Sequence, residues 1–152
     1  MLRLVGNMIA QFRARQSRKV TIGVQAVVTD RDSGVLLVRH RYREGWHFPG
    51  AGVEPNETVE QAITRELKEE VGVVLNGRPA LFNIYAHFVA FPQDHIVLFV
   101  ATEWTRARVP TRSFEIAEQR FFALDALPEG ITAGTKRRLD EVFSGAAHVT
   151  DW

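Results

Sequence analysis

Three glutamates, Glu66, Glu69 and Glu70, are spaced so that their carboxylates can act together. On a helix, residues at positions i, i+3 and i+4 lie on one side, so the three side chains can converge. Clustered carboxylates repel one another, and a small divalent cation is a simple compensation for that repulsion. Carboxylate oxygens are the preferred ligands of hard ions such as Mg²⁺ and Mn²⁺. The spacing therefore indicates a candidate metal site.

The segment that carries these glutamates has the signals of a helix over residues 58–71. Thr58 and Gln61 form a capping-box pattern, in which each side chain hydrogen-bonds the backbone amide of the other residue. Gly72 suits the left-handed residue that often closes a helix. The sequence therefore predicts a helix with a defined start and a defined end.

The predicted helix does not place its glutamates opposite its apolar residues. At about 100° per residue, Glu66 and Glu70 fall within the apolar arc, and Glu69 falls at its edge. The arc is formed by Val59, Ala62, Ile63, Leu67 and Val71. Burying unpaired carboxylates is costly, so this arrangement needs a compensating charge. Two interpretations stay open: a bound cation, or a solvated charge run with ion pairs to neighbouring arginines.

Residues 51–73 resemble the Nudix box. That pattern is a glycine, five residues, a glutamate, seven residues and then Arg-Glu-U-x-Glu-Glu-x-Gly-U, where U is a bulky aliphatic residue. Eight of its nine fixed positions match in register, at Glu57, Arg65, Glu66, Leu67, Glu69, Glu70, Gly72 and Val73. The departure is Ala51, which replaces the first glycine. If the backbone there needs a positive φ, alanine costs about 1 kcal/mol relative to glycine.

The resemblance covers roughly residues 20–145 and implies an α+β fold, an α/β/α sandwich with a mixed β-sheet. It implies one Nudix hydrolase domain, which we place at residues 19–147. It also implies water attack at phosphorus, hydrolysing a pyrophosphate bond in a nucleoside diphosphate linked to another moiety, with Mg²⁺ or Mn²⁺ as cofactor.

The resemblance also implies roles for individual residues. Glu66, Glu69 and Glu70 match metal-binding, catalytic glutamates. Gly50 matches the glycine before the box, whose carbonyl contacts the metal. Glu57 and Arg65 match a pair that braces the loop against the helix.

The general base is less defined by the sequence. Metal ions lower the pKa of a bound water, and a carboxylate can then accept its proton. Glu66 can serve within the helix, but the family often takes its base from a later loop or strand. There Glu118 is a candidate catalytic residue and Glu115 another. The alternative for both is a surface carboxylate beside a strand.

Candidate substrate-binding residues come just before the box. Arg39, Arg41 and Arg43 can bind phosphate through paired hydrogen bonds, or can instead neutralise the glutamates or lie in solvent. Trp46 can stack on a base, although an aromatic residue in a strand is more often part of the core.

The remaining elements must position these residues. Strands are predicted at 20–30 and 34–40, joined as a hairpin, and at 46–48, 81–91, 95–104 and 119–124, with a second helix at 133–143. Residues 1–18 read as an amphipathic N-terminal extension or helix, and a mitochondrial transit peptide is the alternative. No apolar run is long enough for a transmembrane helix.

Composition limits the function further. The chain has 152 residues, a formal net charge of +1 and no cysteine. The missing cysteine excludes disulfide scaffolds and cysteine nucleophiles, and the near-zero charge argues against bulk electrostatic binding of nucleic acid or membrane. The charge is uneven, because residues 54–70 hold six of the 18 acidic residues and follow a basic stretch.

The sequence thus predicts a cytoplasmic, metal-dependent pyrophosphohydrolase that acts on a small nucleotide derivative. A homodimer is compatible with it. Two alternatives stay open: a non-catalytic Nudix-fold module that binds a nucleotide or a partner, supported only by Ala51, and an RNA 5′-end pyrophosphohydrolase that uses the basic 1–43 region.

Overall fold

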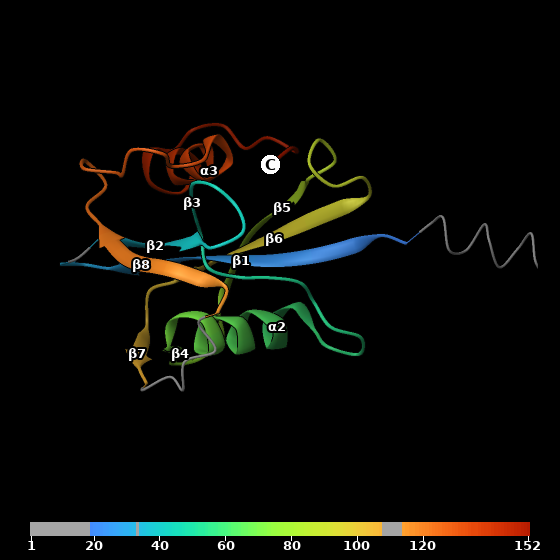
Figure 1. Ribbon diagram of the computed structural model, residues 1–152, viewed down its shortest axis with the longest axis horizontal. Coiled ribbons are helices and arrows are strands. Elements are labelled where there is room, and N and C mark those ends of the chain that lie inside the picture. Colours follow the sequence, from blue (N-terminus) through green and yellow to red (C-terminus); the bar gives the residue numbers. More distant parts are fainter. Residues whose placement is uncertain (1–18, 33, 108–113) are drawn as a thin grey trace, which may run out of the picture.

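A computed structural model describes residues 19–32, 34–107 and 114–152. In that part of the chain, a six-stranded mixed sheet lies between helices on its two faces (Figure 1). Helix α2 (Val59–Glu66), which continues as the π-helical turn η1 (Leu67–Val71), covers one face, and α3 (Ala133–Ser144) covers the other. The expected α/β/α sandwich of the α+β class is confirmed. The extension at residues 1–18 lies outside the described residues.

The sheet has the order β3-β2-β1-β6-β5, with β8 paired to β2 on its other side. Its strands are β1 (Thr21–Asp30), β2 (Gly34–His40), β3 (Trp46–His47), β5 (Ala80–Ala86), β6 (Asp94–Ala101) and β8 (Ile116–Phe122). β1 runs parallel to β6, whereas the β2–β8 and β5–β6 pairs are antiparallel. A separate two-stranded sheet pairs β4 (Val73–Leu75) with β7 (Trp104–Arg106).

The predicted hairpin forms, but its strands separate after two paired positions, Thr29 with Val35 and Asp30 with Gly34. Along the first half of β1, residues 49–53 take the place of β2. The Val24 amide donates to the Ala51 carbonyl at 2.8 Å, and the Val53 amide donates to the Ile22 carbonyl at 2.9 Å. The loop before α2 is therefore fixed to the sheet as an extra strand-like segment.

Alternating side chains of the sheet fill two cores. Val24, Ala26 and Val28 of β1 face α2, where they pack with Ile63 and Leu67. The opposite face packs against α3 and contains Val27, Leu37, Trp46, Phe48, Tyr85, Leu98, Phe122 and Leu139. We call these two faces of the sheet the α2 side and the α3 side.

Several element boundaries differ from those predicted. The strand expected at 81–91 ends at Ala86, because residues 87–94 form a turn closed by the His87 amide on the Asp94 carbonyl at 2.9 Å. The strand expected at 95–104 is divided between β6 and β7, and the one expected at 119–124 already begins at Ile116. The short β4 was not predicted.

The end of the described chain is part of the core, beyond the expected domain limit at residue 147. Asp151 pairs with Ala86, and the Trp152 amide donates to the Ala86 carbonyl at 2.9 Å. The Trp152 ring contacts Phe48 and Tyr85 edge-on. Among all described residues, no helix is both long and apolar enough to cross a bilayer.

Candidate active site

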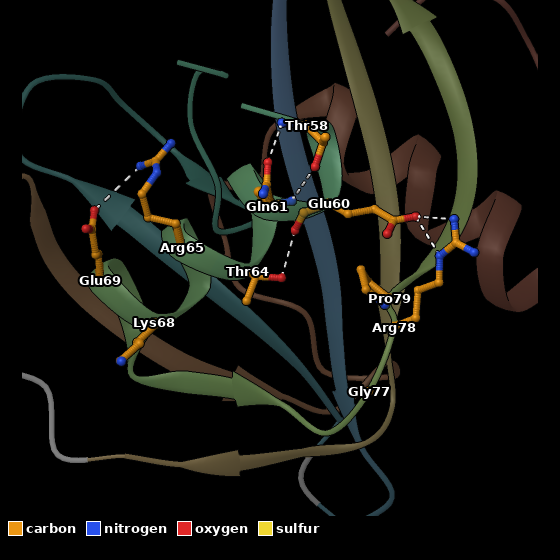
Figure 2. Close-up of a pocket in the computed structure, with 10 residues that line it drawn as sticks. All are labelled: Thr58, Glu60, Gln61, Thr64, Arg65, Lys68, Glu69, Gly77, Arg78 and Pro79. Carbon is orange, nitrogen blue, oxygen red and sulfur yellow. Dashed lines mark hydrogen bonds and ion pairs between the residues drawn. The ribbon is translucent and has the colours of Figure 1, made fainter. Parts of the chain in front are cut away.

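The helix that carries the glutamates begins as expected and ends in an unexpected way. Thr58 and Gln61 form the capping box, with N···O distances of 2.9 and 3.1 Å (Figure 2). After Glu66 the helix widens into the π-turn η1, which Gly72 closes at φ 69°. Such turns are frequent at functional sites, and this one carries Glu69 and Glu70.

The three glutamates have different surroundings. Glu66 is 8% exposed, and one of its oxygens contacts the Arg65 guanidinium. Glu70 turns inward, and its carboxylate accepts a hydrogen bond from the Gly50 amide at 2.8 Å. The Glu69 side chain is half-exposed and lies 3.6 Å from Arg65 (Figure 2). The two glutamates placed within the apolar arc are therefore more enclosed than the one at its edge.

Glu57 and Arg65 join the loop to the helix. Arg65 donates to both Glu57 oxygens, at 2.7 and 2.9 Å, and also to the Gly52 carbonyl at 3.3 Å. Glu57 in turn accepts from the Glu54 amide. The bonds from Arg65, helped by that amide, lower the Glu57 pKa to about 2. These hydrogen bonds tie the box loop to the helix.

Burial raises the pKa of two of the glutamates. The Glu66 pKa lies above its usual range, and that of Glu70 rises to about 8 although the Gly50 amide opposes the shift. A cation beside them would favour their ionised forms. The donor set, three carboxylates, fits Mg²⁺ or Mn²⁺.

The side chains are nevertheless not gathered around one point. Within the described residues, no three acidic or histidine side chains converge as metal ligands. Glu66 and Glu69 turn to Arg65, and Glu70 turns to Gly50. The residues therefore fit a divalent cation by their chemistry, and binding would require the carboxylates of Glu66 and Glu69 to turn away from Arg65.

The box loop does not carry the strain that Ala51 suggested. Ala51 is not among the residues with positive φ, whereas Gly50 has φ 138°. A Cβ at Gly50 would lie 2.0 Å from the Val24 carbonyl oxygen. The glycine that this backbone requires is therefore Gly50, and Ala51 is accommodated without strain.

A cleft of about 650 Å³ extends from this loop along the first half of β1. It is lined by residues 20–25, Arg43, residues 50–55 and the turn at 87–94. Arg43 is half-buried, and its Nε has no hydrogen-bond partner among the described residues. Burial lowers the Arg43 pKa, while Tyr42 and Glu70 oppose this shift. Arg43 and Gly50 thus connect the cleft to the half-buried carboxylate of Glu70.

The family model described as NUDIX domain matches residues 19–142 of the chain. The chain belongs to the NUDIX family. The MutT NUDIX hydrolase of Burkholderia pseudomallei superimposes with a TM-score of 0.68 at 30% identity, over 80% of this chain and 97% of that one. The expected fold and enzyme class of this Nudix domain, a Nudix hydrolase, are confirmed.

Two curated relatives of the Nudix domain carry different names. An 8-oxo-dGTP diphosphatase of Proteus vulgaris is 38% identical over 51% of this chain and 72% of its own length. An RNA pyrophosphohydrolase of Haemophilus influenzae is 28% identical over 85% of this chain. This chain spans only 61% of the length of that second relative.

Three of the candidate residues lie away from the glutamates of this Nudix domain. Trp46 is 8% exposed and packs edge-on against Phe122, so it is a core residue and not a free stacking surface. Arg39 covers the Trp46 ring and bonds Glu118 at 2.9 Å. Glu118 also contacts Arg120, and these arginines keep its pKa below its usual range. The group lies on the α3 side, whereas α2 carries the glutamates on the other side.

Glu115 is the candidate base whose charge acts on Glu70. Its carboxylate contributes to the raised pKa values of Glu70 and Tyr42. Its carbonyl accepts from the Arg41 amide at 2.9 Å, whereas the Arg41 side chain is exposed. Of the three arginines before the box, only Arg43 lines the cleft.

The sequence reasoning did not single out Gln25, which lies in the cleft wall. Its Oε1 is buried and has no hydrogen-bond partner among the described residues. A polar residue within the apolar segment 24–28 was the available signal, because a buried strand is otherwise nearly continuous in its apolar residues.

Proposed function

We propose that this protein is a metal-dependent pyrophosphohydrolase that acts on a nucleoside diphosphate linked to another moiety. The observation that carries the proposal is the contact between Glu70 and the Gly50 amide, at the end of a cleft that also contains Arg43. A half-buried carboxylate, a cationic guanidinium and a cleft of about 650 Å³ are therefore adjacent here. Pockets of several hundred Å³ are typical of small-molecule sites.

Glu66, Glu69 and Glu70 are the residues that would hold Mg²⁺ or Mn²⁺, with the Gly50 carbonyl as a further ligand. The ion supplies charge neutralisation at phosphate and a lowered pKa for a bound water. Arg43 binds the phosphate oxygens, because its guanidinium is charged and half-buried at the cleft. The Glu57–Arg65 pair keeps the loop at a fixed distance from the helix.

Glu66 and Glu115 are the two candidates for accepting the proton of the attacking water. Burial raises the Glu66 pKa toward the range that suits a general base near neutral pH. The charge of Glu115 acts on Glu70. Glu118 is not one of these candidates, because its carboxylate is paired with Arg39 and Arg120 on the α3 side of the sheet.

The names of the relatives support two substrate classes, a nucleoside triphosphate and the 5′ end of an RNA. Both contain the phosphoric anhydride bond that the proposed chemistry cleaves. The one sequence argument for a non-catalytic binding module was a strained backbone at Ala51, and Ala51 does not have a positive φ.

The test is a substrate panel with Mg²⁺ or Mn²⁺ that contains nucleoside triphosphates, nucleotide sugars, ADP-ribose, dinucleoside polyphosphates and 5′-triphosphate RNA. Release of phosphate, pyrophosphate or nucleotide from at least one of them is expected. If none is hydrolysed at high enzyme concentration, the proposal fails.

Two glutamine variants of the same helix test the role of Glu70, with Glu60 as the control position. Glu70→Gln should lower turnover by about a hundredfold or more, because it removes a ligand charge while its amide oxygen can still accept the Gly50 hydrogen bond. Glu60→Gln, an acidic position on the same helix paired with Arg78 at 2.7 Å, should keep nearly full turnover. Equal turnover of both variants would contradict the ligand assignment.

A further inference from the structure

Two glycines face each other on the floor of the cleft. Gly23 of β1 and Gly52 of the box loop form an antiparallel β-bridge, and both line the cleft. Neither residue has a positive φ. Their backbones are therefore in conformations that any residue can adopt.

Packing does not require glycine at these positions either. A Cβ at Gly23 would meet only the carbonyl oxygens of Ala51 at 3.8 Å and His95 at 3.9 Å, which are ordinary contacts. A Cβ at Gly52 would meet nothing within 4 Å. Glycine is also unfavourable in extended segments. Neither the backbone nor the neighbouring atoms require glycine at these two positions. Glycine within a strand can also mark a site where a ligand approaches the backbone closely.

The side chains around this floor suit a flat ring. His87 and Phe91 lie 5.3 Å apart between ring centroids, and the exposed Phe91 ring stands at the rim. The His87 imidazole lies 3.2 Å from the Asp94 carboxylate, which holds it in place. Gln25, two residues beyond Gly23 on the same face of β1, adds amide groups for hydrogen bonding. Arg43 and Gly50 lie at the phosphate end of the same cleft.

We infer that the Gly23–Gly52 pair is the platform for the planar base of the substrate, and that it determines selectivity for base-containing over base-free pyrophosphates. This inference rests on the proposed function of the same site. It places the base against bare backbone beside His87 and Phe91, with its phosphates toward Arg43. A side chain at either glycine would occupy the volume of the ring.

Gly23→Val tests the inference, because valine is favoured in strands and its Cβ would make only ordinary contacts at this position. Thr29→Val on the same strand is the matched control outside the cleft. Dissociation constants would be measured by calorimetry without metal for GMP, AMP and ribose 5-phosphate. Gly52→Val provides a second, independent test of the same platform.

The wild type should bind at least one nucleotide more tightly than ribose 5-phosphate. Gly23→Val and Gly52→Val should weaken nucleotide binding by roughly tenfold, within the range attributed to base stacking, and should leave ribose 5-phosphate binding and the control unchanged. The inference would be overturned if both glycine variants lost affinity equally for nucleotides and ribose 5-phosphate, or lost none for either. It would also be overturned if the wild type bound nucleotides no more tightly than ribose 5-phosphate.

Hydrolysis distinguishes this inference from the proposed function. If the inference is right, Gly23→Val raises KM for a base-containing substrate by roughly tenfold with kcat nearly unchanged, and base-free 5-phosphoribosyl pyrophosphate is unaffected. A protein that binds nucleotides in this way but hydrolyses nothing would refute only the proposed function. A protein that hydrolyses with unaltered KM in both glycine variants would refute only the platform.

Discussion

At the scale of single residues, Glu115 and Glu118 show how three positions of sequence separate two environments. The pairing of β2 with β8 shifts register between Arg39 and His40, so that Glu118 lies opposite Arg39 and Ile116 opposite His40. Ile116 packs into the core on the α2 side. Glu118 instead lies with the arginines around Trp46 on the α3 side.

This difference in environment predicts different effects on turnover for Glu118→Gln and Glu115→Gln. Glu118→Gln should leave turnover within about twofold, because a surface ion pair contributes little beyond its neighbourhood. Glu115→Gln should lower turnover by about tenfold or more if this carboxylate takes part in proton transfer. Steady-state rates on the best substrate of the panel decide the matter, and the reverse order of effects would restore Glu118 as the base.

At the scale of elements, the box loop depends on a glycine that the motif does not include. Gly50 combines φ 138° with a Cβ position 2.0 Å from the Val24 carbonyl oxygen. Ala51 next to it has neither constraint. Here the neighbouring strand β1 imposes the glycine requirement.

Gly50→Ala should therefore destabilise the fold by about 3 kcal/mol or more, through overpacking and a strained φ. Ala51→Gly, which restores the family glycine, should lower the free energy of unfolding by only about 0.4–1 kcal/mol, because glycine increases the conformational entropy of the unfolded chain. Urea unfolding of both variants provides the measurement. A stabilising Ala51→Gly would show that strain exists at this position after all.

Helix α3 carries a buried charge that ties the end of the described chain to the sheet. Arg138 is fully buried, donates to Glu141 at 2.9 Å and to the Asp151 carbonyl at 2.9 Å, and lies over the Tyr85 ring. Tyr85 donates to the other Glu141 oxygen at 2.5 Å. The charges of Arg138 and Glu141 are therefore paired with each other inside the protein.

Arg138→Met should cost about 3–5 kcal/mol, because it leaves the Glu141 charge buried without its partner. The adjacent Arg137 is exposed and donates to the Trp152 carbonyl at 2.6 Å, so Arg137→Met should cost less than about 1 kcal/mol. Denaturant midpoints of the pair measure the difference. Equal midpoints would contradict a structural role for the buried pair.

At the scale of the whole molecule, two enclosed histidines couple stability to pH. The pKa values of His40 and His47 fall to about 4, first through burial and then through nearby Arg43. Between pH 6.5 and about 4 the unfolded state binds more protons than the folded state at these sites. Their contribution to stability is thus complete above pH 6.5 and is lost as the pH falls. Glu66 and Glu70, with raised pKa values, act in the opposite direction.

His40→Leu isolates one of these contributions. Neither ring nitrogen of His40 has a hydrogen-bond partner among the described residues, so an apolar side chain of similar size should be tolerated. The difference in unfolding free energy between variant and wild type should grow in favour of the variant, by about 1.4 kcal/mol per pH unit from 6.5 down to about 4. Urea unfolding at several pH values measures it, and a constant difference would contradict the buried, neutral state of His40.

Much of the site was predictable because its signals are local. The capping box at Thr58 and the cap at Gly72 depend on residues within one turn, and the glutamate spacing depends on helical geometry alone. The separation of β1 from β2 was not predictable, because it depends on which strands pair. A chain reversal between β5 and β6 was predicted after residue 91, but β5 already ends at Ala86. Trp46 packs against Phe122 of β8 in the core, which is the more common outcome for an aromatic residue in a strand.

The sequence by itself determined the family, the sandwich fold and the helix that presents Glu66, Glu69 and Glu70, because each follows from short-range pattern and spacing. Only the tertiary structure decided which arginine lines the cleft, which later glutamate acts on Glu70 and where glycine is needed. Those outcomes depend on long-range pairing: the register shift between β2 and β8, and the box loop lying against β1. Residues far apart in the chain are in contact at these two places, and local propensity does not specify such long-range contacts.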